Sequence, residues 1–280
     1  MSDLPPLRES LDSHGLLAKK AFGQHFLLDL NVTRKIVRLA QTSLKNGPFD
    51  GETVIEVGPG PGGLTRALLE TEARKVIAVE KDSRFLDLLN ELKTPYGDRF
   101  DVVEGDALKV DEARLLAGHG LPPEAHIVSN LPYNVGTPLL VKWLTGPWQP
   151  RSLTLMFQLE VARRIVAPAG DDDYGRLGVL CQVLCDGRRV MDLPARAFTP
   201  PPKVDSAVVH LVPKADRPDP AVIRRLEALT AAAFGQRRKM LRSSLKGHGG
   251  EALLDKAGIA PTLRAEQVPP QDFLRLALCQ

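Results

Sequence analysis

The stretch TVIEVGPGPGGLTRALLE, residues 53–70, decides the fold that we expect for this chain. It opens with an apolar, β-branched run typical of a buried strand, and it closes with LTRALLE, which has helical spacing. Between them lie four glycines, which let the backbone turn sharply and approach a ligand closely. These glycines are Gly58, Gly60, Gly62 and Gly63. A strand that enters a helix through such a loop predicts an α/β fold with a parallel sheet.

Short apolar runs and helical runs alternate along most of the chain. We expect strands at 53–58, 75–80, 100–106, 126–130, 152–158 and 206–213, and helices at 64–70, 83–92, 160–167 and 175–185. The strands are too continuously apolar for a sheet with one wet face, so helices should cover both faces. Residues 214–220 are proline-rich and charged, and 221–280 show helical patterns alone. The sequence thus predicts a mostly parallel α/β domain over 1–213 and a small all-α domain over 214–280.

The composition is that of an ordinary globular protein, with 43% hydrophobic and 25% charged residues. No apolar run reaches the roughly 18 residues that a membrane span needs. The first residues, MSDLPPLRESLDSHG, lack the apolar core of a secretory signal. We therefore expect a cytoplasmic protein that does not enter a membrane.

The three cysteines predict neither disulfides nor a metal site. An odd count without paired spacing argues against a disulfide framework. Cys181 and Cys185 are four residues apart in an apolar run, so we expect them to share a helix face as small buried hydrophobes. A zinc site would need further nearby ligands, which the sequence does not offer. We expect no metal.

Positive charge is concentrated at the C-terminal end. Residues 214–280 hold 12 Lys and Arg against 7 Asp and Glu, whereas the remaining residues hold 25 against 27. In this segment Arg237, Arg238, Lys239, Arg242 and Lys246 fall mostly three or four apart, so a helix would group them. Such a run is often only a solvated face. Its place in the basic segment favours contact with nucleic-acid phosphates.

Acidic side chains stand at the ends of two predicted strands. Glu80 closes the second strand, where an acid can accept both hydroxyls of a ribose. Asp106 ends the third strand and can accept from the amino group of an adenine; a turn-forming or capping aspartate is the alternative. Pro59 and Pro61 remove N–H donors from the glycine loop. The loop therefore fits a nucleoside cofactor without a phosphate better than a dinucleotide, with a plain βα turn as the alternative.

The fourth strand ends in HIVSNLPYN, residues 126–134. The side-chain oxygen of Asn130 and the carbonyl of Leu131 can accept the two hydrogens of an exocyclic amine, and Pro132 fixes the direction of that carbonyl. The ring of Tyr133 offers a stacking face for a base, worth roughly 1–3 kcal/mol. Two acceptors outside the ring plane would localise the nitrogen lone pair for attack on a methyl group. The alternative is a proline-terminated strand with a buried tyrosine.

Two further segments contain candidate site residues. In ARAFTPPPKVDSAVV, residues 195–209, three prolines stiffen the backbone, so Phe198 is held in place and could cover the other face of a base. Lys203 could meet a phosphate; a stiff connector with a core phenylalanine is the alternative. In KKAFGQHFLLD, residues 19–29, His25 is polar among apolar neighbours, and on the residues alone a structural histidine is the better interpretation.

Taken together, these motifs resemble the KsgA/RsmA family of small-subunit rRNA adenine N6,N6-dimethyltransferases. The segments that carry the resemblance run in order: GQHFL (23–27), EVGPGPGGLT (56–65), VIAVEKD (76–82), EGDAL (104–108), NLPYN (130–134), YGRLGVL (174–180), FTPPPKVDSAVV (198–209) and FGQRRKMLR (234–242). The glycine loop alone indicates a class I methyltransferase. NLPY narrows this to amino methylation, and the last two segments point to this family.

The resemblance implies a Rossmann-like domain that binds S-adenosylmethionine, and a helical C-terminal domain that binds RNA. It implies dimethylation of two adjacent adenosines near the 3′ end of 16S rRNA, late in assembly of the small ribosomal subunit. A partner as large as a ribosomal subunit makes a monomer the default expectation. His25 and Leu27 join Gly58, Gly60, Glu80, Asp106 and Asn130 as implied cofactor contacts, while Asn130, Leu131, Pro132, Tyr133 and Phe198 take the target adenine. Lys203, Arg237, Arg238, Lys239 and Arg242 are the RNA candidates. Leu159 stands where the family often has Lys, and His25 where many members have Asn.

Three alternatives remain at this point. An Erm-type enzyme, which methylates an adenine of large-subunit rRNA, would share the fold, the cofactor and an NLPY-like motif. A non-catalytic assembly or transcription factor would not require intact Gly58, Glu80, Asp106 and Asn130, all of which are present. An NAD-dependent oxidoreductase would need an acid/base partner near NLPY, and the sequence offers none.

Overall fold

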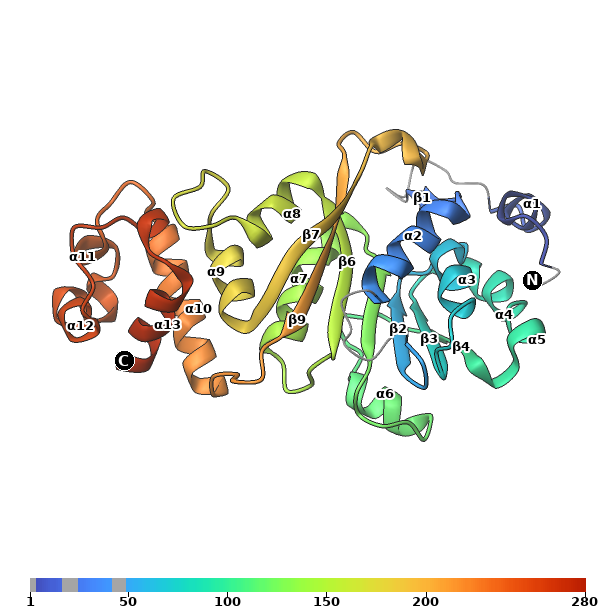
Figure 1. Ribbon diagram of the computed structural model, residues 1–280, viewed down its shortest axis with the longest axis horizontal. Coiled ribbons are helices and arrows are strands. Elements are labelled where there is room, and N and C mark those ends of the chain that lie inside the picture. The colour runs from blue at the N-terminus through green and yellow to red at the C-terminus, as the bar shows by residue number, and fades with distance from the viewer. Residues whose placement is uncertain (1–3, 17–24, 42–48) are drawn as a thin grey trace. The chain divides into compact units, whose positions relative to one another are not determined.

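A computed structural model describes residues 4–16, 25–41 and 49–280 of the chain (Figure 1). These form two compact units, one of Met1–Leu159 with Val190–His210 and one of Glu160–Arg189 with Leu211–Gln280. The division differs from the predicted boundary between residues 213 and 214. The physical reason is that helix α9 (Arg176–Leu184) packs against α10 (Pro220–Phe234) and α13 (Pro270–Cys279), so it groups with the C-terminal helices.

The central sheet has seven strands in the order β4-β3-β2-β5-β6-β9-β7. Their bounds are β2 (Thr53–Val57), β3 (Lys75–Glu80), β4 (Phe100–Glu104), β5 (His126–Asn130), β6 (Ser152–Gln158), β7 (Cys185–Leu193) and β9 (Ser206–Pro213). β2 pairs in parallel with both β3 and β5, and the β3–β4 and β5–β6 pairs are also parallel. The strand order reverses between β2 and β5. In open α/β sheets, ligands bind outside the carboxyl ends of the strands at such a point.

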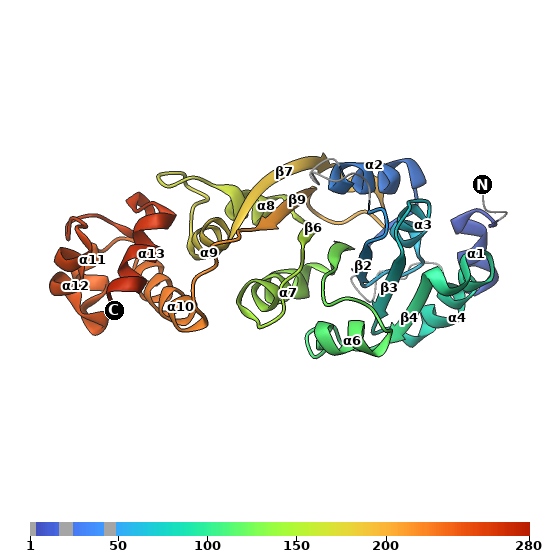
Figure 2. The ribbon, with the colours of Figure 1, turned by 60° about the horizontal axis from the view of Figure 1, so that its bottom comes forward.

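Helices cover both faces of the sheet in the first unit, as predicted. Figure 2 shows α2 and α3 on one side of β2 and β3, and α6 and α7 on the other. The bounds are α1 (Leu7–Ser13), α2 (Leu30–Gln41), α3 (Gly63–Leu69), α4 (Leu86–Asn90), α5 (Lys93–Tyr96), α6 (Glu112–Gly118) and α7 (Tyr133–Thr145). The predicted helix 83–92 is a 3₁₀ turn, Ser83–Phe85, followed by α4, because the Asp82 carboxylate caps the turn by accepting from Arg84 N. The predicted elements did not include α6 or α7.

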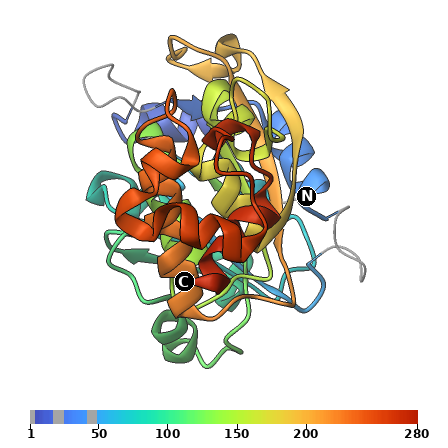
Figure 3. The same cartoon turned by 90° about the vertical axis from the view of Figure 1, so that its left-hand side faces the viewer.

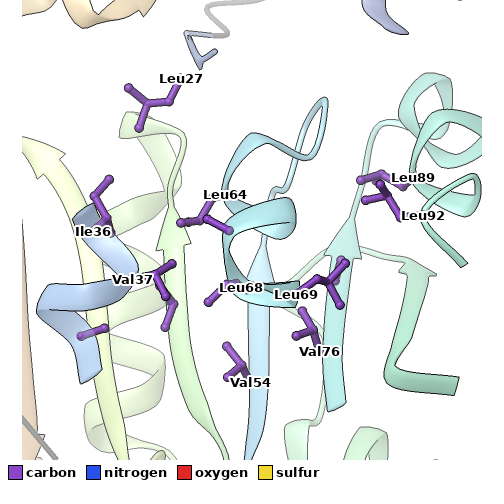
Figure 4. Close-up of a cluster of buried hydrophobic side chains, with 14 of the residues drawn as sticks. Leu27, Ile36, Val37, Val54, Leu64, Leu68, Leu69, Val76, Leu89 and Leu92 are labelled. Carbon is purple, nitrogen blue, oxygen red and sulfur yellow. The ribbon is translucent and has the colours of Figure 1, made fainter. Parts of the chain in front are cut away.

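The core of this unit fixes the glycine loop in place. Figure 4 shows Leu64 and Leu68 of α3 above Val54 of β2 and Val76 of β3, and all four are buried. Burying an aliphatic side chain of this size contributes roughly 1.5–3 kcal/mol relative to leaving it exposed. The first turn of α3 is therefore held on the sheet, and so is the loop that precedes it.

The second unit has its own helical core, visible as the orange and red helices of Figure 3. Its helices are α8 (Leu159–Val166, from residue 160 on), α9, α10, α11 (Leu241–Ser244), α12 (Gly250–Ala257) and α13. The ring of Phe234 lies 5.6 Å from that of Phe273 and 5.8 Å from that of Tyr174, centroid to centroid. The prediction of helices alone over 221–280 is confirmed. No helix within the described ranges is long and apolar enough to cross a membrane.

The prediction that Cys181 and Cys185 share a helix face is wrong. α9 ends at Leu184, and Cys185 is the first residue of β7. Both thiols are nevertheless buried, and burial raises the pKa of each. Their interpretation as small buried hydrophobes is confirmed.

The prediction that one helix groups the basic residues of 237–246 is also wrong. α10 ends at Phe234, residues 235–240 form turns, and α11 begins only at Leu241. The backbone leaves the helix because Leu241 N and Arg242 N donate to the carbonyls of Leu263 and Pro261 instead of to α10. Arg237, Arg238 and Lys239 therefore project from a turn.

Candidate functional site

A cleft of about 1010 Å³ opens at the carboxyl ends of β2, β3, β4 and β5 in the first unit. It is the place where the reversal of strand order predicts a ligand. Ten of the predicted site residues line it: His25, Gly58, Gly60, Glu80, Asp106, Asn130, Leu131, Pro132, Tyr133 and Phe198. Among the described residues, Leu27 does not line the cleft; its side chain is buried in the core. Gly23 and Gln24 of the GQHFL motif lie outside the described residues.

The cleft gains one wall from a two-stranded sheet that the sequence did not predict. β1 (Phe26–Leu27) pairs antiparallel with β8 (Phe198–Thr199), with Leu27 opposite Phe198. His25 directly precedes β1, and its Nδ1 lies 2.7 Å from the carbonyl oxygen of Pro200, which directly follows β8. This pairing brings His25 and Phe198 to one site across more than 170 positions of sequence.

Gly60 fits the loop for two reasons. Its φ of +52° is strained for other residues, and a Cβ there would lie 3.1 Å from the ring of Phe26. Its N–H donates to Glu80 Oε2 at 3.0 Å. The loop is thereby tied to the end of β3.

Gly63 packs directly beneath β1. A Cβ at this position would lie 2.4 Å from the carbonyl oxygen of Leu27, which is backbone and cannot rotate away. We expect Gly63→Ala to lower the free energy of unfolding by about 1–3 kcal/mol, because β1 must shift to admit the methyl group. Urea denaturation measures this. Gly118→Ala is the matched control, because a Cβ at Gly118 meets nothing within 4 Å; an equal effect of the two changes would contradict the prediction.

Glu80 is held rigidly at the end of β3. Its Oε2 accepts from Gly60 N, and its Oε1 accepts from Asp82 N at 2.8 Å. Burial raises the pKa of the Glu80 carboxyl, and these backbone hydrogen bonds oppose the shift. The second lone pair of each oxygen can still accept from a ligand hydroxyl.

Asp106 is fixed in the same way at the end of β4. Its Oδ1 accepts from Leu108 N at 3.1 Å, and its Oδ2 from Lys81 Nζ at 3.0 Å. The hydrogen bond from Lys81 lowers the pKa of the Asp106 carboxyl, with the Leu108 N–H contributing. Two neighbouring strand ends therefore present oriented carboxylate acceptors to the cleft.

A third acid, Glu56, lies under the glycine loop and had no predicted role. It is 1% exposed, and its Oε2 accepts from Thr65 Oγ1 at 2.6 Å. Burial raises the pKa of this carboxyl to about 8, and Glu80 adds to the shift, while the Thr65 hydrogen bond opposes it. An acid in the middle of the apolar run TVIEV was the signal in the sequence that could have identified it.

The end of β5 presents Asn130 to the cleft. Its Nδ2 donates to the carbonyl of His25 at 3.5 Å, so the side-chain oxygen is the atom left to accept. Pro132, with φ −56° and ψ 133°, caps α7, and its carbonyl accepts from Val135 N and Gly136 N. The turn that carries the Leu131 carbonyl is therefore fixed by both the proline ring and the first turn of α7.

Tyr133 is anchored at its hydroxyl. Its Oη lies 2.6 Å from Ser206 Oγ, and Ser206 is fully buried. Burial raises the pKa of the Tyr133 phenol, and the Ser206 contact opposes the shift. The ring faces the His25 ring at 6.0 Å between centroids, with a tilt of 30°. Ser206 lies in the FTPPPKVDSAVV motif, but the sequence did not predict its contact with Tyr133.

We expect Ser206→Ala to lower the rate of methyl transfer about 3- to 10-fold without changing cofactor affinity. The hydroxyl of Tyr133 loses the hydrogen bond that holds its ring in place, and the net contribution of such a bond is about 0.5–1.5 kcal/mol. Single-turnover kinetics and equilibrium cofactor binding measure the two effects. Ser152→Ala is the matched control, because Ser152 is equally buried and contacts His126 Nδ1 at 2.8 Å outside the cleft lining. An unchanged transfer rate in Ser206→Ala would contradict the prediction.

The basic RNA candidates differ in their contacts. Lys203 is exposed on the segment between β8 and β9, and Arg238 and Lys239 are exposed in the turn after α10. Arg237 donates to the carbonyls of Tyr174 at 3.0 Å and Asp172 at 3.4 Å, so it also braces the loop before α9. Arg242 lies 3.9 Å from a carboxylate oxygen of Glu251.

Comparison with known proteins identifies the family of this chain. The family model described as "Ribosomal RNA adenine dimethylase" matches residues 15–279. The chain belongs to the ribosomal RNA adenine dimethylase family. The resemblance drawn from the motifs is thereby confirmed, and so is the prediction that the chain is a methyltransferase.

Relatives in the family are similar along nearly the whole chain. A protein of Phenylobacterium zucineum (strain HLK1), named Ribosomal RNA small subunit methyltransferase A, is 65% identical over 277 residues, which cover 99% of this chain and 93% of the relative. A protein of the same name from Caulobacter vibrioides (strain ATCC 19089 / CIP 103742 / CB 15) is 64% identical over 261 residues, covering 93% of this chain and 96% of the relative.

Solved structures confirm the class I methyltransferase fold. A dimethyladenosine transferase from Plasmodium falciparum aligns with a TM-score of 0.72 and 26% identity, covering 90% of this chain and 96% of that one. The 23S rRNA methyltransferase ErmE aligns with a TM-score of 0.66 and 29% identity, covering 91% and 98%. The names of these similar proteins therefore give two RNA targets: the small subunit for the two bacterial relatives and 23S rRNA for ErmE.

Proposed function

We propose that this chain transfers methyl groups from S-adenosylmethionine to the N6 amino groups of two adjacent adenosines near the 3′ end of 16S rRNA. The product is N6,N6-dimethyladenosine, made late in assembly of the small ribosomal subunit. The observation that carries the proposal is the convergence of Glu80, Asp106, Asn130 and Tyr133 on one cleft. The partner is the precursor of the small subunit with its rRNA, and the enzyme acts as a cytoplasmic monomer.

The residues of the cleft fit an adenosyl cofactor without a phosphate. Gly58 and Gly60 let the backbone come close, with φ of +66° and +52°. Glu80 would accept the ribose hydroxyls, and Asp106 would accept the cofactor's adenine amino group. His25 closes the cleft beside Asn130, and the backbone of Leu27 packs against Gly63 at the end of the glycine loop. When bound, S-adenosylmethionine supplies an electrophilic methyl group.

The residues at the end of β5 would handle the target base. The Asn130 oxygen and the Leu131 carbonyl accept the two amino hydrogens from outside the ring plane, which localises the nitrogen lone pair. The ring of Tyr133 stacks on the adenine, and Phe198 covers its other side. The same two oxygens stabilise the positive charge that develops on the nitrogen. Catalysis would then rest on positioning and electrostatics.

The target RNA would be held through its phosphates. Lys203, Arg238 and Lys239 are exposed, and with Arg237 and Arg242 they form the proposed contacts. The choice of the small subunit rests on the relatives at 64–65% identity, whose name specifies it. The likeness to ErmE keeps a large-subunit target as the second candidate.

The test uses S-adenosylmethionine with a labelled methyl group. Immature small subunits that lack the modification and unmodified large-subunit rRNA are incubated separately with the protein, then digested to nucleosides. We expect labelled N6,N6-dimethyladenosine from the small subunit alone. Label on the large-subunit rRNA would indicate an Erm-type activity instead. Cofactor binding without label on either RNA would indicate a non-catalytic binding factor.

A further inference from the structure

A partly buried ion cluster joins α7 to the loop that carries Asp106. The ammonium group of Lys142 on α7 donates to the carbonyl of Ala107 at 2.8 Å and to that of Val110 at 2.5 Å. It also donates to Glu112 Oε1 at 2.7 Å. A lysine ammonium has three hydrogens, so all three donors are used.

The other members of the cluster make it rigid. The side chain of Glu112, the first residue of α6, is 7% exposed and accepts a second hydrogen bond from Trp143 Nε1 at 2.7 Å. Trp143 is itself 1% exposed. A buried charge pair stabilises a conformation only when its remaining hydrogen bonds are satisfied, and here the Trp143 N–H and two backbone carbonyls complete the set.

The cluster acts on the peptide groups next to Asp106. Ala107 follows Asp106 directly, and Lys109 N and Val110 N donate back to the Asp106 carbonyl at 2.8 and 3.2 Å. Pinning the carbonyls of Ala107 and Val110 therefore fixes the tight turn that aims the Asp106 carboxylate. The three hydrogen-bond partners of the Lys142 ammonium all lie between residues 107 and 112, so its direct effect is on the loop that follows β4.

We propose that Lys142 is a positioning residue that orients Asp106 toward the amino group of the cofactor's adenine, an inference that rests on the proposed function. The same lysine belongs to α7, which begins at Tyr133. One helix thus carries the stacking ring for the target base at its start and the support for the cofactor's adenine near its end.

The test compares two ligands whose only difference is the group that Asp106 would recognise. One is S-adenosylhomocysteine, and the other is its purine-riboside analogue, which lacks the exocyclic amino group. Calorimetry gives the Kd of each for the wild-type protein, Lys142→Met and Lys35→Met. Lys35 is the control for the same chemical change, because its side chain is exposed on α2, away from the loop that carries Asp106.

We expect the wild-type protein and Lys35→Met to prefer S-adenosylhomocysteine by about tenfold, the effect of one hydrogen bond to a charged acceptor. In Lys142→Met this preference falls to about twofold or less, while the Kd of the purine analogue stays unchanged. A general loss of structure would weaken both ligands equally. If Lys142→Met retains the full preference, the proposal is overturned.

A second variant is needed because removal of the lysine leaves the Glu112 charge unpaired, which can unfold the protein. Glu112→Gln with Lys142→Met removes that charge but restores no donor to Ala107 or Val110, so it should show the same loss of preference. A wild-type protein that binds neither ligand would instead contradict the proposed function. These two failures are distinguishable because the second is seen before any substitution is made.

Discussion

An Asn130→Ala variant is expected to lose methyl transfer by about 10²–10³-fold, the usual effect of removing one preorganised group that stabilises charge in a transition state. The amide is held in place by its donation to the carbonyl of His25 at 3.5 Å. Its side-chain oxygen is the acceptor that would draw the target amine out of conjugation. Without it, the nitrogen keeps its lone pair delocalised, and the developing positive charge has one acceptor fewer.

Two measurements separate this effect from a loss of binding. Single-turnover transfer to immature small subunits gives the rate, and calorimetry with S-adenosylhomocysteine gives the cofactor affinity, which should fall far less than the rate. Asn90→Ala, at the end of α4, is the matched control and should behave as the wild type does. A transfer rate in Asn130→Ala within threefold of the wild-type rate would contradict the proposed role of the amide.

The second large effect concerns stability and comes from Glu56. In the unfolded chain this carboxyl titrates near 4.5, whereas in the folded protein its pKa is raised to about 8. Between these pH values the folded protein keeps a proton that the unfolded chain has lost. The free energy of unfolding therefore falls as pH rises from about 4.5 to about 8, by on the order of 5 kcal/mol at most.

Glu56→Gln removes this dependence, because the amide mimics the neutral acid and can still contact Thr65. We expect the variant to match the wild type near pH 4.5 and to exceed its stability increasingly toward pH 8. Urea denaturation at a series of pH values gives the difference between the two proteins. Glu104→Gln makes the same chemical change on an exposed residue of β4 and should show no such trend. A constant difference between Glu56→Gln and the wild type at every pH would refute the prediction.

The sequence predicted the sheet well where each strand is an apolar run. All six predicted strands are present, because β-branched runs such as TVIEV and KVIAVE have no alternative to burial between helices. β7 was missed because CDGRRVMDL is charged and contains a glycine, a composition that a strand at the edge of a sheet tolerates. Its residues from Asp186 to Arg189 are exposed.

The site was predictable to the extent that it depends on strand ends. Parallel strands deliver Gly58, Glu80, Asp106 and Asn130 to one edge, so a correct strand assignment was enough to group them. The contacts of Tyr133 with Ser206 and of Lys142 with the Ala107 carbonyl join elements far apart in sequence. No local pattern encodes those distances, and they follow only from the packing of α7.

The pairing of β1 with β8 has a consequence for the protein while it is being made. Leu27 leaves the ribosome long before Phe198, its partner across the two strands. At roughly 5–20 residues per second, the interval between them is on the order of 10–30 s. In the later part of that interval the emerged chain already contains the glycine loop, Glu80 and Asp106, but its cleft lacks the wall that β8 supplies. A nascent chain of this protein should therefore acquire full affinity for its cofactor only after Phe198 has left the ribosome.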